Sequence, residues 1–318
     1  MDWKTVNAEL VWTHEKVTSL AGWTVDAKVV LTTSAYYVLA QQDFDAESFL
    51  CTMDELKKRA GWLSPVRGNF LPMLASFLDT AGMPAEQAVS GLFERQQVLR
   101  KAGFKNTVHS FLAAMLMTPV PATYQTEAVQ AKRLYNEMKK QHFLLTSDED
   151  YSYAMLLGKL NNDPAEQASL MRKYYDELNG TGFRSGTELQ WLSQVLTIDR
   201  CTFEEKRIDR AKQLLKHVHK RVNLKPMHYP LIGFMVILDC NEAQIEELIS
   251  LANCLAKEDL FKWHKTLAFS FGTGYLLQQY MEQGQAAGVP RKLQVLIRQA
   301  ILAATIATIA ASTTSALS

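Results

Sequence analysis

The sequence predicts an all-α protein built from helical hairpins. Apolar residues recur at intervals of three and four along most of the chain, which is the spacing of one helix face. Almost no stretch alternates apolar and polar residues, so we expect essentially no sheet. Helix start and stop signals return about every 40 residues, and a two-helix repeat of that length is typical of α-solenoids of the HEAT and armadillo kind. A closed α/α toroid built from the same hairpins is the alternative.

Two short motifs mark the repeat. Pro-Ala-Glu-Gln-Ala begins at Pro84 and again at Pro164, and Gly-Phe follows at Gly103 and at Gly182. Half of that spacing separates the long helices, which we expect to begin near residues 46, 84, 126, 164, 203 and 243. Short helices are expected to begin near residues 27, 69, 107, 151, 187 and 229.

Stacked hairpins bury apolar faces that a single hairpin leaves exposed. With 318 residues and 47% hydrophobic side chains, the chain can form a large core. We therefore expect one elongated or curved unit over residues 1–318 rather than two globular domains. It comprises an N-terminal helix and turn (1–26), about six hairpins (27–257) and a C-terminal helix pair with an uncharged tail (258–318).

In the first half of the chain, apolar stripes and stop signals define seven helices. Phe49, Met53 and Leu56 form one such stripe, and Gly61 ends its helix because glycine adopts the left-handed conformation at little cost. The β-branched run Val-Val-Leu-Thr-Thr after residue 28 also suits a short strand, but no partner strand is evident. The expected helices are 6–20, 27–41, 46–59, 69–79, 84–101, 107–117 and 126–140.

The second half carries clearer start signals. Asp163 is a typical N-cap, Pro164 fits the first helical position, and Glu166 suits the positive end of the helix dipole. Capping-box pairs are expected at Ser185 with Glu188, Thr202 with Glu205, and Asn241 with Gln244. The expected helices are 148–160, 164–178, 187–196, 203–222, 231–238, 242–256, 263–282 and 290–311.

Two segments resemble a known family. Asp148-Glu-Asp-Tyr precedes a Leu-Leu helix, and Gly182-Phe-Arg-Ser-Gly precedes Leu-Gln and Leu-Ser pairs that end at Leu196. This pattern resembles the bacterial DUF4003 family of uncharacterised proteins, found mainly in low-GC Gram-positive bacteria. The sequence departs from the family pattern at Tyr153, where a Pro-Leu pair is common, and at Thr187, where Asn is common. The resemblance covers most of the chain, including residues 261–263, and implies no catalytic residue.

Composition restricts the partners and the compartment. The formal charge is +1, from 34 basic and 33 acidic residues, so no net field attracts nucleic acid or an acidic membrane surface. The polar start Met-Asp-Trp-Lys predicts no signal peptide. The four cysteines form no CxxC pair, and we expect reduced, buried thiols in a cytoplasmic protein. They are Cys51, Cys201, Cys240 and Cys254.

No motif indicates a catalytic residue, a cofactor or a metal ion. Residues 148–150 form an acidic first helical turn with Ser147 as its cap, and residues 216–221 form a basic last turn. His217 and His219 are two apart and do not share a helix face, which argues against a metal-chelating pair. Residues 272–274 (Gly-Thr-Gly) follow no strand, so close helix packing explains them better than phosphate binding.

Two further stretches are candidate binding surfaces. One helix carries Arg207, Arg210, Lys212, Lys216, Lys220 and Arg221. Acidic residues interrupt this row and no aromatic row accompanies it, which disfavours nucleic-acid binding. The tail from Gln299 to Ser318 has no charge, and its apolar run 300–311 is too short to span a bilayer. We expect a packing helix there, with self-association or membrane contact as alternatives.

The first functional hypothesis is a non-enzymatic helical-repeat scaffold that binds a protein or peptide, because such repeats offer extended surfaces. The alternative is an enzyme whose acid and base residues converge on a concave face from distant repeats. Nucleic-acid binding ranks third, and membrane binding is not expected.

Overall fold

The computed structural model describes residues 3–21, 25–62, 64–68, 70–262, 265–285 and 289–314. Every regular element in these ranges is helical, with fifteen α-helices and three short 3₁₀ turns. Only an isolated bridge between Asn179 and Phe183 interrupts this pattern. The predicted all-α class is therefore confirmed. The possible strand after residue 28 lies inside a helix, α2 (Ala27–Ala40).

The chain divides into two compact units. Unit 1 comprises residues 1–128 with 309–318, and unit 2 comprises residues 129–308. The long helices from α3 onward begin 36 to 43 residues apart, as the hairpin repeat requires. The single-unit organisation, the kind of repeat and the closed toroid stay predictions.

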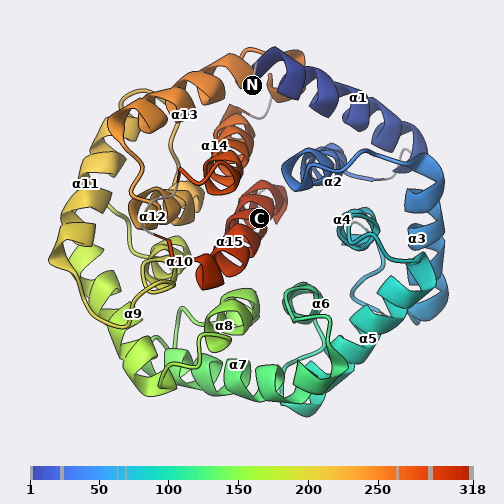
Figure 1. The fold of residues 1–318 in the computed structure, drawn as a ribbon, viewed down its shortest axis with the longest axis horizontal. Coiled ribbons are helices and arrows are strands. Elements are labelled where there is room, and N and C mark those ends of the chain that lie inside the picture. The colour runs from blue at the N-terminus through green and yellow to red at the C-terminus, as the bar shows by residue number, and fades with distance from the viewer. Residues whose placement is uncertain are drawn as a thin grey trace. The chain divides into compact units, whose positions relative to one another are not determined.

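Unit 1 consists of two layers of helices. Long helices pack side by side in one layer and short helices in the other, and each long helix contacts the short helix that follows it (Figure 1). The long layer contains α1 (Trp3–Ala21), α3 (Ala46–Arg59), α5 (Ala85–Lys101) and the first turns of α7 (Pro121–Gln141). The short layer contains α2, α4 (Phe70–Asp79) and α6 (Val108–Met115).

The short helices are buried on all sides. In α2, ten consecutive residues from Val30 to Leu39 are buried. Two of its polar side chains satisfy themselves within the helix, because the Thr32 hydroxyl donates to the Lys28 carbonyl at 2.7 Å and the Ser34 hydroxyl to the Val30 carbonyl at 2.8 Å. The long helices instead bury one stripe, as α3 does with Phe49, Met53 and Leu56.

Unit 2 repeats this arrangement and adds two long helices at its C-terminal end. Its long layer contains the rest of α7, α9 (Pro164–Leu178), α11 (Glu205–His219) and α13 (Glu242–Leu255). Its short layer contains α8 (Tyr151–Gly158), α10 (Thr187–Val195) and α12 (Tyr229–Ile237), and the longer α14 (Lys265–Glu282) packs against α12 and α13. The final helix, α15 (Arg291–Thr314), packs against α14.

Glycines allow the closest approaches between these helices. A Cβ atom at Gly272 would lie 3.2 Å from Leu255 Cδ1 of α13, and one at Gly274 would collide with Thr305 of α15. The packing role predicted for residues 272–274 is confirmed. The tail also packs as expected as far as its side chains are described, since Ala300 and Ala304 are buried. Side chains from residue 308 onward lie outside the described residues.

Several predicted start signals are correct. The Asp163 carboxylate accepts from the amides of Ala165 and Glu166 at 3.0 and 2.9 Å, and Asn241 forms the expected capping box with Gln244. One helix starts earlier than expected: α7 begins at Pro121 rather than near residue 126. Proline suits the first helical turn, where its missing amide hydrogen is no loss.

Two predicted capping boxes are wrong. The N-cap residues of α10 and α11 are Gly186 and Glu204, and neither caps through its side chain. The Glu204 carboxylate accepts from Arg207 Nε at 2.9 Å in a partly buried ion pair, one residue before the Glu205 of the predicted box.

The expectation of buried thiols holds only in part. All four cysteines are free, but Cys51 and Cys201 are exposed, whereas Cys240 is buried. Each exposed thiol lies on the solvent side of its segment. Apolar neighbours in the sequence therefore did not indicate burial of the cysteine itself. Among the described residues, no helix has the length and apolar content needed to cross a bilayer.

Candidate functional site

One carboxylate of the acidic turn before α8, that of Asp150, is buried in the protein interior. Ser147 starts a 3₁₀ turn, Asp148–Asp150, and its hydroxyl accepts from the Glu149 amide at 3.2 Å. The Ser147 amide donates to Asp150 Oδ2 at 3.0 Å, so the predicted cap is confirmed. Asp150, however, is completely buried rather than part of a solvated acidic turn.

Two glutamines of α10 hold this buried carboxylate. Gln190 Nε2 and Gln194 Nε2 donate to Asp150 Oδ1 at 3.0 and 2.9 Å. Within the part of the chain that the structure describes, no cation pairs with this carboxylate. Burial raises the pKa of Asp150 to about 6, although the hydrogen bonds act to lower it. The glutamine Oε1 atoms are buried without a hydrogen-bond partner. The arrangement joins α8 to α10, and Asp150 lines none of the surface hollows described below.

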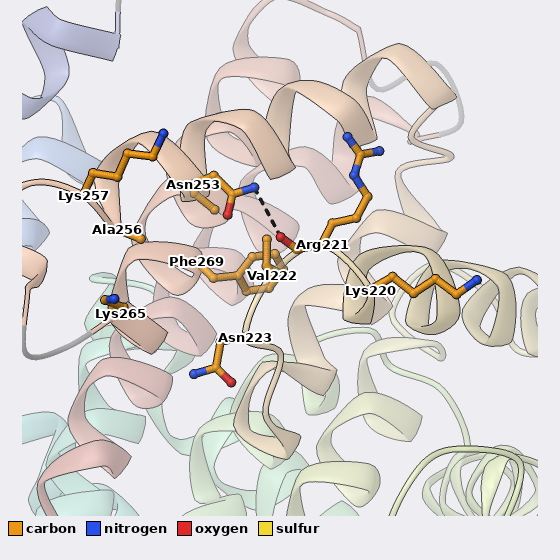
Figure 2. A pocket seen from close by; sticks show the side chains of 10 residues that line it. Lys220, Arg221, Val222, Asn223, Asn253, Ala256, Lys257, Lys265 and Phe269 are labelled. Carbon is orange, nitrogen blue, oxygen red and sulfur yellow. Dashed lines mark hydrogen bonds between the residues drawn. The ribbon is translucent and has the colours of Figure 1, made fainter.

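A different site lies on the surface of unit 2. A hollow of about 630 Å³ lies between the loop after α11, the end of α13 and the start of α14. Figure 2 shows the side chains that line it. Its rim is cationic and amidic, and its floor is apolar. The rim residues are Lys220, Arg221, Asn223, Asn253, Lys257 and Lys265, and the floor residues are Val222, Ala252, Ala256 and Phe269. We call it the first basic hollow.

A second basic hollow of about 570 Å³ is lined by α11 itself, just before the loop that lines the first. Its charged residues come from α11, from the loop before α10 and from the loop before α12. They are Arg184, Lys212, Lys216, His219 and Lys225, beside apolar Leu215, Leu224, Pro226 and Tyr229. The Arg184 amide donates to the Tyr229 hydroxyl at 3.2 Å, which fixes one wall.

Among the described residues, no carboxylate lines either hollow. Elsewhere, exposed lysines pair along their own helix, as Lys57 does with Asp54 at 3.0 Å and Lys140 with Glu137 at 2.6 Å. Of the lining cations, Lys212 and Arg221 lie near a carboxylate, at 3.9 and 2.5 Å. Within the described residues, Lys216, Lys220, Lys225, Lys257 and Lys265 form no such pair. We call the charged side chains of both hollows together the basic loop surface.

The helix dipole explains only part of this surface. Lys216 and His219 lie in the last turn of α11, where a positive charge stabilises the helix end, as predicted. Lys265 is the first residue of α14, where the same dipole disfavours a cation. Lys225 and Lys257 lie in connecting segments. The accumulation of cations therefore exceeds what helix capping requires.

The structure separates the two histidines of α11 and divides the basic row of that helix. His217 Nε2 lies 2.8 Å from Glu246 Oε1 on the side away from His219, so the two histidines do not converge. Arg207 is buried against Asp199 at 2.7 Å, and Arg210 donates to the Cys240 carbonyl at 2.6 Å. The predicted basic row of α11 is thus divided. The described residues contain no cluster of three His, Cys, Asp or Glu suited to a metal ion.

Sequence inspection missed the basic loop surface. Arg184 lies 28 residues before Lys212, and Lys257 and Lys265 lie more than 30 residues after Lys220; packing brings each beside these cations. The inward turn of Asp150 was missed for the same reason. The sequence signal that could have indicated a buried acceptor is the pair Gln190 and Gln194, because a spacing of four places both amides on one helix face.

The fold and surface define an all-α protein with two adjoining basic hollows. A family model described as "Protein of unknown function (DUF4003)" matches residues 13–314, and the chain belongs to this family. It is similar to the "Uncharacterized protein YeaA" of Bacillus subtilis (strain 168), with 24% identity over 295 residues, 91% of this chain and 89% of the relative. No solved structure gives a significant match.

Proposed function

We propose that this protein is a non-enzymatic helical scaffold whose basic loop surface binds an acidic segment of a protein partner. The observation that carries the proposal is the pair of adjoining hollows with cationic rims and no carboxylate, on a chain whose formal charge is only +1. Such a local positive field attracts anionic groups and speeds their association. The free cysteines support a partner in the reducing cytoplasm.

The shape of the hollows favours a polypeptide over a nucleic acid. Single-stranded nucleic acids need exposed aromatic rings for base stacking, whereas Phe269 and Tyr229 are only 2% and 4% exposed. The apolar floors suit the aliphatic parts of peptide side chains, and the rims suit their carboxylates.

Charge reversal tests the proposal. Full-length protein is purified with its partners from the native cells as wild type, as Lys216→Glu with Lys220→Glu, and as Lys57→Glu with Lys58→Glu. The third form changes the charge equally on α3, which lines neither hollow. We expect the recovered amount of one partner protein to fall roughly tenfold or more with Lys216→Glu and Lys220→Glu. With Lys57→Glu and Lys58→Glu, its recovery should match that of the wild type.

Equal recovery of every partner with both variants would contradict the proposal. Thermal melting of the three proteins shows whether a loss reflects binding or folding. Lys216 and Lys220 are exposed and unpaired, so their reversal should leave the melting temperature within a few degrees.

A further inference from the structure

Two adjacent large apolar side chains protrude from the segment between α7 and the 3₁₀ turn. Phe143 is 72% exposed and Leu144 is 93% exposed. The other large apolar residues that are exposed in the described ranges are isolated in sequence. Isolated examples are common on protein surfaces, but an adjacent pair forms a contact patch whose burial would release water.

The segment that carries this pair is fixed at both ends. Arg172 Nη1 donates to the Gln141 carbonyl at 2.9 Å, and the His142 ring packs edge-on against Tyr175 with ring centres 4.5 Å apart. At the far end, Gln190 Nε2 donates to Thr146 Oγ1 at 3.1 Å. These contacts fix the backbone on both sides of Phe143 and Leu144, so a partner orders little more than their side chains.

The same helix end supports the second basic hollow. The Tyr175 hydroxyl accepts from the Gly186 amide at 3.2 Å, and Gly186 lies two residues after Arg184, which lines that hollow. The segment that carries the apolar pair and the loop that carries Arg184 therefore both contact Tyr175, near the C-terminal end of α9.

We propose that the partner segment carries bulky apolar side chains beside its acidic ones. The apolar side chains cover Phe143 and Leu144, and the carboxylates enter the basic hollows. This inference rests on the proposed function and names the chemistry of the partner. Two concave hollows with apolar floors receive individual side chains, whereas a bilayer surface presents a layer of headgroups, so the geometry favours a polypeptide over a membrane.

Site-specific photo-crosslinking tests this inference in the full chain. The photoreactive residue p-benzoylphenylalanine replaces Phe143 in one protein and Asn223, on the rim of the first basic hollow, in another. A third protein carries it at Glu166, which is exposed in the first turn of α9, at the opposite end of that helix. After irradiation of living cells, mass spectrometry identifies what is attached and at which residue.

We expect the same partner at positions 143 and 223, attached within one stretch that contains both acidic and bulky apolar residues, and no such adduct at 166. Protein adducts at 223 without any at 143 would overturn the inference and leave the proposed function standing. The absence of any protein adduct at position 223 would contradict both the inference and the proposed function. Lipid or nucleic-acid adducts at 143 would assign the apolar pair to another ligand.

A binding measurement provides the second test. The crosslinked stretch, made as a synthetic peptide, is titrated into wild type, into Phe143→Ser with Leu144→Ser, and into Trp62→Ser. Trp62 is an isolated apolar side chain, 86% exposed, and serves as the matched control. We expect the double variant to bind roughly tenfold or more weakly and the control to bind as wild type. Equal affinity of the double variant would overturn the inference.

Discussion

Gln190 Nε2 donates a hydrogen bond to the completely buried carboxylate of Asp150 at 3.0 Å. These residues are 40 apart in sequence and belong to the two segments that carry the family resemblance. Their contact joins the turn before α8 to α10, so the segments that identify the family also form one structural connection. A buried acid without a cation makes the stability of this connection dependent on pH.

The first prediction concerns Asp150. Its folded-state pKa is raised from 3.8 to about 6, so the folded state binds a proton more readily than the unfolded state. The stabilisation from protonation is fully present below about pH 4 and is lost as the pH rises through 6, by about 3 kcal/mol in total. We expect Asp150→Asn to remove this component from urea unfolding measured between pH 4 and 7.5.

Glu149→Gln is the control for that series, because Glu149 is the exposed neighbour of Asp150. A wild-type and an Asp150→Asn protein whose stabilities differ by the same amount at every pH would show that Asp150 titrates normally.

The second prediction concerns His228, whose effect on stability has the opposite pH dependence to that of Asp150. His228 is buried, accepts from the Lys225 amide at Nδ1, and lies 3.1 Å from the Thr266 carbonyl at Nε2. Burial lowers its pKa from 6.5 to about 4, so its contribution is fully present above pH 6.5 and is lost as the pH falls through 4. Relative to His228→Gln, wild type should lose about 3 kcal/mol of unfolding free energy on acidification.

Because the two groups titrate in opposite directions over the same range, the pH profile of the wild type alone is expected to be shallow. Each single variant should therefore make the profile steeper, in opposite senses. A His228→Gln profile parallel to that of the wild type would contradict the assigned neutral histidine.

The third prediction concerns the contact between α7 and α8. A Cβ atom at Gly158 would lie 2.9 Å from the backbone nitrogen of Ala131, and a backbone atom cannot move aside as a side chain can. Gly158→Ala should lower the free energy of unfolding by about 1–3 kcal/mol, despite the better helix propensity of alanine. Chemical denaturation measures this difference.

Gly91→Ala is the matched comparison inside a helix. Its Cβ atom would meet only the flexible end of Arg95, at 3.4 Å, so we expect an unchanged or slightly higher stability. Equal effects of the two substitutions would mean that α7 and α8 are not in close contact at Gly158.

Local signals predicted the helices well and the sites poorly. Asp163 and Pro164 lie within a few residues of the amides they serve, so the start of α9 could be predicted from sequence. The Glu204 carboxylate could not be assigned, because its choice between a cap and Arg207 depends on the buried position of Arg207. The direction of Asp150 and the meeting of Lys220 with Lys265 depend on helices packed later in the chain.

The most direct test of the proposed function is zero-length carbodiimide crosslinking of the native complex, because the reagent joins a lysine amine to a carboxylate only when the two are in contact. The pairs Lys57 with Asp54 and Lys140 with Glu137 are internal controls for the reagent. We predict amide bonds from Lys216, Lys220, Lys225, Lys257 or Lys265 to acidic residues of one partner protein. If the internal controls react while none of these five lysines joins a partner, the basic loop surface does not bind an acidic segment and the proposed function is wrong.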